Sequence, residues 1–123
     1  MKTFFDIPDF DSKVISESEH FVMIYDGYPV NPGHILIISK KQVKDYFELS
    51  NEAQFDLNNA LKKSKEIIEQ NHSPDGYNIG MNCGEYAGQT VFHFHCHLIP
   101  RYKGDMDDPR GGVRHCVAGK GYY

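Results

Sequence analysis

Three histidines, His93, His95 and His97, alternate with apolar residues near the C-terminal end of the chain. Successive side chains of a β-strand point to opposite faces, so a strand here carries the three imidazoles on one surface and apolar side chains on the other. Burying three titratable rings on one face is costly unless each finds a partner. We therefore predict a strand over residues 91–100 with one face built for the core and the other for chemistry.

Length, charge and cysteine content restrict the class of protein. The 123 residues suit one domain spanning 1–123, and the net charge of −4 argues against a nucleic-acid binder. Since the chain has no apolar run of membrane-spanning length and no secretory leader, we expect a cytoplasmic protein without a membrane partner. Its three cysteines form no CxxC pair, so we expect reduced thiols rather than a disulfide framework or a cysteine-rich zinc site.

Patterning along the chain predicts an α+β domain with a five-stranded, mainly antiparallel sheet and two helices packed on it. The expected strands cover residues 13–16, 20–25, 34–39, 77–83 and 91–100. We expect a short helix within residues 40–49, and a longer amphipathic helix that starts at the N-cap Ser50 and ends before Pro74. An N-terminal arm (1–12) with aromatic anchors and an irregular tail (102–123) flank these elements.

Three roles compete for the alternating histidines. They can be satisfied structural residues, although three on one face make this a weak explanation. They can bind zinc with help from His34, Asp26 or Glu85, but rings spaced along one straight strand do not converge easily on one ion. The third role is nucleophilic catalysis, since a neutral imidazole with a pKa near 6.5 needs no activating base at pH 7. We favour the third role and predict no metal ligands.

The motif and two other segments resemble a known family. Residues 93–99 (HFHCHLI) resemble the histidine-triad (HIT) pattern, and residues 87–91 and 31–38 resemble the loop and the second signature of that family. The resemblance runs from about residue 15 to residue 101. It implies a HIT-like fold and a nucleotide hydrolase or transferase of the bacterial type. It also implies a homodimer in which two five-stranded sheets join into one.

The resemblance implies a role for each matching residue. His95 would attack the α-phosphate of a nucleotide, His93 and His34 would orient it, and His97 would contact the phosphate or the leaving group. Asp26 would hold the ribose hydroxyls. The other implied substrate contacts are Asn82, Gln89 and Thr90 for the phosphates or the leaving group, and Phe5, Ile7 and Ile24 for an adenine or other purine base.

We therefore predict an enzyme that cleaves a dinucleoside polyphosphate, of the diadenosine tetraphosphate type, through a covalent nucleotidyl-histidine intermediate. Residues 109–114 (PRGGVR) resemble the tail of bacterial family members and differ from that of the phosphoramidase branch. The alternatives are a purine nucleoside phosphoramidase and a non-catalytic nucleotide- or zinc-binding module. No cofactor is expected to be required, although a divalent cation such as Mg²⁺ can accompany the substrate phosphates.

Overall fold

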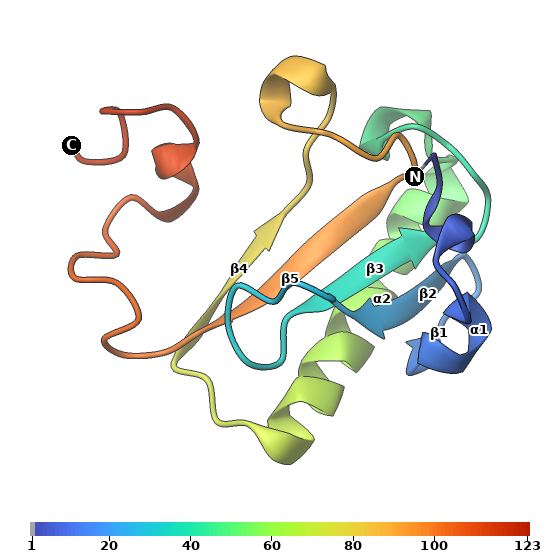
Figure 1. Ribbon diagram of the computed structural model, residues 1–123, viewed down its shortest axis with the longest axis horizontal. Helices are drawn as coiled ribbons and strands as arrows, with labels where there is room; N and C mark the ends of the chain where they lie inside the picture. Colours follow the sequence, from blue (N-terminus) through green and yellow to red (C-terminus); the bar gives the residue numbers. More distant parts are fainter. Residues whose placement is uncertain (1) are drawn as a thin grey trace.

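A computed structural model describes residues 2–123 and contains one antiparallel sheet with the strand order β1-β2-β3-β5-β4 (Figure 1). Its strands are β1 (Ser16–Glu17), β2 (Phe21–Tyr25), β3 (Ile35–Ser39), β4 (Gly76–Gly80) and β5 (His95–Arg101). Together with the two α-helices described below, α1 and α2, the sheet confirms the predicted α+β fold class.

Helix α2 (Asn51–Asn71) covers one face of the sheet (Figure 1). Its start is as predicted, since the Ser50 side chain accepts a hydrogen bond from the N–H of Ala53. The apolar positions of α2 recur at helical spacing, so they form a stripe that packs against the inward-facing strand residues. This larger core includes Leu57, Ala60 and Ile68 from α2, and Phe21, Met23, Ile35, Ile37, Phe94, Cys96 and Leu98 from the sheet side.

The N-terminal arm covers part of the opposite face of the sheet. It contains a 3₁₀ turn, η1 (Phe4–Asp6), and a short helix, α1 (Phe10–Lys13). Phe4 and Phe10 are buried against Ile24 of β2 and against Leu36 and Ile38 of β3. The aromatic anchors expected in the arm therefore bury the second face of the sheet at β2 and β3, while the rest of that face is left to the histidines.

Four elements differ from the prediction. Strand β4 ends at Gly80, three residues before the predicted end at residue 83. Helix α1 takes up Lys13, so the first strand starts only at Ser16. The helix expected within residues 40–49 is a 3₁₀ turn, η2 (Tyr46–Glu48), because it is confined between the cap at Asp45 and the N-cap of α2. Strand β5 begins at His95 rather than at residue 91, since the N–H of Phe94 donates to the Val43 carbonyl. His93 therefore precedes the strand.

The loops and the tail contain little regular structure. The loop before β5 includes the 3₁₀ turn η3 (Glu85–Ala87), and the tail includes η4 (Gly112–Cys116) and lies beyond β4 in Figure 1. Hydrogen bonds within the tail, such as that from the Tyr122 hydroxyl to the Asp108 carbonyl, hold its turns together. Among residues 2–123, each helix is too short or too polar to cross a bilayer.

Gly33 allows the chain to turn into β3, and its replacement tests that turn. Its φ is +92°, and a Cβ there would lie 3.1 Å from His72 and 3.2 Å from Ile68 at the end of α2. We expect Gly33→Ala to lower the free energy of unfolding by about 1–2 kcal/mol or more, through backbone strain plus crowding. Denaturant unfolding monitored by circular dichroism measures the change.

Gly27→Ala is the matched control, since a Cβ at Gly27 meets nothing within 4 Å. We expect it to change the unfolding free energy by less than about 0.5 kcal/mol. Equal effects of the two substitutions would contradict the structural reason given for Gly33.

Candidate active site

The pairing of β3 with β5 places two of the histidines on the face of the sheet opposite α2. His95 is opposite Ile38 and His97 is opposite Leu36 in the antiparallel register. Leu36 and Ile38 belong to the core under the N-terminal arm, whereas Cys96 between the histidines belongs to the core under α2. The alternation therefore places side chains as predicted at His95 and His97, with the imidazoles on one face of the sheet and Cys96 in the core on the other.

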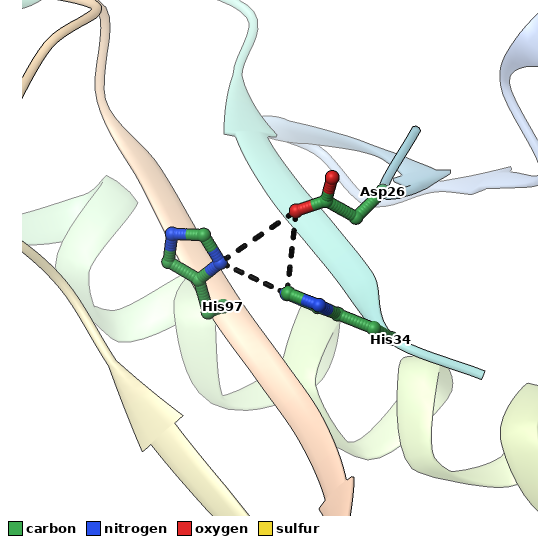
Figure 2. A group of neighbouring side chains, drawn as sticks. All are labelled: Asp26, His34 and His97. Atoms are coloured by element: carbon green, nitrogen blue, oxygen red, sulfur yellow. Dashed lines mark hydrogen bonds and ion pairs between the residues drawn. The ribbon is translucent and has the colours of Figure 1, made fainter. Parts of the chain in front are cut away.

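His34 immediately precedes β3 and meets His97 from the neighbouring strand (Figure 2). His34 Nε2 lies 2.9 Å from His97 Nδ1, and the Asp26 carboxylate lies 3.4 Å from the former and 3.9 Å from the latter. Among residues 2–123, this trio brings three ligand-type atoms within 4.8 Å of one another, so it is the group that could hold a metal ion. Three further zinc ligands were considered from the sequence. His34 and Asp26 belong to this trio, and Glu85 does not.

The ring of His95 is held with one nitrogen available for reaction. Its Nδ1 lies 2.9 Å from the carbonyl oxygen of His93, and because a carbonyl only accepts, Nδ1 carries the hydrogen. The neutral ring then has an unprotonated lone pair at Nε2. The Phe4 ring packs against the imidazole in an edge-to-face arrangement, with 4.7 Å between centroids. This arrangement provides a nucleophile, a general base or a metal ligand.

His93 is fully buried and connects the arm to the sheet. Its Nε2 donates to the Ser39 carbonyl at 2.8 Å, and its Nδ1 accepts from the N–H of Phe4 at 3.2 Å. Its ring also packs against Phe5, with 4.8 Å between centroids. Both ring nitrogens of His93 thus have hydrogen-bond partners. His93 therefore contacts His95 through its main-chain carbonyl rather than through its imidazole.

A cavity of about 490 Å³ opens beside the trio, within the range of small-molecule sites. His97, His34 and Asp26 line it together with Asn82, and Val113 of the tail forms part of its wall. Thr90 is exposed on the loop before β5. The structure thus brings Asn82 and Asp26, two of the predicted substrate contacts, to the same cavity as His97.

Gln89 is buried, and its side chain bonds to the main chain around it. Its Oε1 accepts from the N–H of Gly84, and its Nε2 donates to the carbonyls of Lys44 and Val91. Its own main-chain N–H donates to the Gly84 carbonyl. All N–H groups of Gln89 therefore have protein acceptors, so it braces the loop before β5, and its contact with phosphate stays a prediction.

The residues predicted for a base pocket fall into two environments. Phe5 and Ile7 line a depression on the N-terminal arm, away from the cavity at His97. Ile24 is almost fully buried together with Leu36 and Phe10 in the core under the arm, so it offers little surface to a ligand. Phe4, which was predicted only as an aromatic anchor of the arm, contacts His95. The fold brings these two residues together, so no local sequence pattern indicates the contact.

Burial lowers the pKa of all four histidines at the site. It is the main cause at His34, His93 and His95, and it acts against the raising effect of the Asp26 charge at His34 and His95. Burial and the neighbouring His95 and His34 bring the pKa of His97 down to about 4. The imidazoles are therefore neutral at pH 7, as nucleophilic or hydrogen-bonding roles require.

Comparison with known proteins shows the family of the chain. The family model described as the HIT domain matches residues 8–104 of the chain. The chain belongs to the HIT family. A crystal structure of a HIT family member from Bacillus subtilis is 33% identical, with a TM-score of 0.73, over 85% of this chain and 77% of that one.

Two curated relatives of this HIT domain have names that state an activity. The bis(5'-nucleosyl)-tetraphosphatase [asymmetrical] of Schizosaccharomyces pombe is 39% identical over 80 residues, which are 65% of this chain and 44% of the relative. The AP-4-A phosphorylase of Mycobacterium tuberculosis is 29% identical over 102 residues, which are 82% of this chain and 52% of the relative. The HIT domain thus spans about half the length of these two proteins.

The lowered histidine pKa values make stability depend on pH. An unfolded histidine takes up a proton near pH 6.5, whereas His97 in the folded protein does so only near pH 4. As the pH falls from 7 toward 4, the unfolded state binds more protons, so the free energy of unfolding decreases. We expect a loss of the order of 2 kcal/mol from His97 alone, measured by urea unfolding at several pH values.

His97→Asn provides the comparison. Because the variant lacks this titrating ring but keeps His34, His93 and His95, its stability should fall less steeply over the same pH interval. An unchanged or steeper fall in the variant would contradict the lowered pKa of His97.

Proposed function

We propose that this HIT protein is a nucleotide hydrolase that acts at the α-phosphate of a dinucleoside polyphosphate. The observation that carries the proposal is the orientation of His95, whose Nδ1–H is bonded to the His93 carbonyl so that the Nε2 lone pair is available for attack. A partly buried imidazole kept neutral in this tautomer is a competent nucleophile at pH 7. The activities named for the yeast and mycobacterial relatives support a dinucleoside tetraphosphate as the substrate.

The reaction consists of two displacements at phosphorus. In the first, His95 Nε2 forms a bond to the α-phosphorus while the bond to the leaving polyphosphate oxygen breaks. In the second, water attacks the same phosphorus, the P–N bond breaks, and a nucleoside monophosphate is released as a proton leaves the water. Hydrogen-bond donors aimed at the phosphoryl oxygens supply much of the catalysis in reactions of this type.

The residues of the neighbouring cavity suit the rest of the substrate. His97 and Asn82 carry donors that can meet phosphate or leaving-group oxygens. The Asp26 carboxylate accepts from the N–H of Tyr28 through Oδ1 and can accept further bonds from ribose hydroxyls. Phe5 and Ile7 remain candidates for contact with a purine base, and Thr90 and Gln89 for contact with the phosphates.

A homodimer is the second part of the proposal. Strand β4 is at the edge of the sheet, and about half of the Ile79 side chain on it is exposed. An edge strand has unpaired main-chain groups that a second copy can bond, which would extend the sheet across two subunits. Sedimentation analysis of the full chain gives the oligomeric state directly.

Replacement of His95 tests the nucleophile. We expect His95→Asn to reduce turnover of diadenosine tetraphosphate roughly 10³-fold or more, because the covalent intermediate cannot form. Product formation is followed by chromatography, and mass spectrometry of the quenched wild-type enzyme detects the nucleotidyl adduct on His95. Circular dichroism checks that the variant is folded.

His115→Asn is the matched control, since His115 lies in the tail, where its Nε2 bonds the Arg110 carbonyl. We expect it to retain wild-type turnover. Near wild-type activity of His95→Asn on diadenosine tetraphosphate and on an adenosine phosphoramidate would show that His95 is not the nucleophile. If the wild-type protein turns over the phosphoramidate faster than diadenosine tetraphosphate, it belongs to the phosphoramidase branch instead.

A further inference from the structure

The main-chain N–H of Val30 determines where His34 carries its hydrogen. This N–H donates to His34 Nδ1 at 3.0 Å, so Nδ1 must present a lone pair. A neutral imidazole has one ring hydrogen, which is therefore at Nε2 of His34. The Asp26 carboxylate, 3.4 Å from Nε2, favours the hydrogen at this position because it attracts the positive end of the N–H dipole.

The hydrogen on His34 in turn sets the tautomer of His97. His34 Nε2 and His97 Nδ1 are 2.9 Å apart and share one hydrogen, which belongs to His34. His97 Nδ1 is therefore an acceptor, and the neutral His97 ring carries its own hydrogen at Nε2. Figure 2 shows this second nitrogen of His97 on the far side of the ring from Asp26 and His34.

We propose that the Val30 amide is a positioning group that, through His34, makes His97 a hydrogen-bond donor to the phosphoryl or leaving-group oxygen of the substrate. The inference rests on the proposed function, since it names what His97 does at that site. His97 transfers no proton in this role: it stays neutral and donates from Nε2. With the opposite tautomer, His97 would direct a lone pair at the phosphate oxygens, and the two would repel each other.

The hydrogen bond from the Val30 N–H to His34 Nδ1 also opposes metal binding by the trio of Asp26, His34 and His97. The separations of 2.9, 3.4 and 3.9 Å between its ligand atoms are each within about 0.6 Å of the edge of a tetrahedral zinc site, about 3.3 Å. Zinc at His34 Nε2, however, would move the ring hydrogen to Nδ1, where it would face the N–H of Val30. The Val30 amide therefore selects hydrogen-bond donation over metal binding at this cluster.

Histidine tautomers are directly observable by long-range ¹H–¹⁵N NMR of protein labelled at histidine nitrogens. We expect His34 and His97 to carry hydrogen at Nε2 and His95 to carry it at Nδ1. A hydrogen at Nδ1 of His34 or His97 would overturn the proposal. Because this measurement requires no turnover, a failure of this proposal can be distinguished from a failure of the proposed function.

Val30→Pro removes the N–H, and Val30→Ala is the conservative variant that keeps it. We expect Val30→Pro to lower kcat on diadenosine tetraphosphate roughly 10- to 100-fold with little change in KM, since a donor acting mainly in the transition state is lost. Val30→Ala should restore kcat and the wild-type tautomers. Equal kcat values for the two variants would contradict the proposal.

Zinc affinity gives an independent measure on the same pair of variants. By calorimetry, we expect Val30→Pro to bind Zn²⁺ at least about tenfold more tightly than Val30→Ala, because the opposing N–H is gone. Equal affinities would contradict the proposed opposition to metal. If Val30→Pro fails to fold, as judged by circular dichroism, the tautomers of the wild-type protein decide the question.

Discussion

The antiparallel pairing of β3 with β5 is the constraint on which the candidate site depends. It sets Leu36 opposite His97 and thereby brings His34, 63 positions earlier in the chain, within hydrogen-bond distance of that ring. Side chains alternate along a strand, so a slip of one residue would turn Cys96 toward the cavity and His97 toward α2. Burial of both faces at β3 makes such a slip costly, since all five of its residues are buried.

Features that depend on local periodicity could be predicted from the sequence. The 3.6-residue repeat and the Ser50 cap gave the position of α2, and the two-residue repeat at His95 and His97 gave their common face. The place of His34 at the site was implied by the resemblance of residues 31–38 to the second HIT signature rather than by periodicity, and the comparisons confirm the family. In each case the information lies within a few residues of the element that it describes.

Features that depend on distant hydrogen bonds could not be predicted. His93 fits the alternation as well as its neighbours do, yet its ring is used by Phe4 and Ser39, residues remote in sequence. Gln89 is predicted to contact phosphate, and no local pattern indicates that its side-chain amide bonds Lys44 and the loop around it. The helix expected within residues 40–49 is a turn for a local reason, since it is confined between the caps at Asp45 and Ser50.

The cavity is lined by residues from two parts of the chain, the HIT domain and the tail. His97 and Asp26 belong to the region matched by the HIT domain, whereas Val113 lies in the tail, outside residues 8–104. Insertions or substitutions in the tail can therefore reshape one wall of the cavity while the strand pairing behind the histidines stays intact. If the proposed function holds, substrate choice and bond cleavage depend on different segments of the chain, so a change in the tail can alter the first without disturbing the histidines.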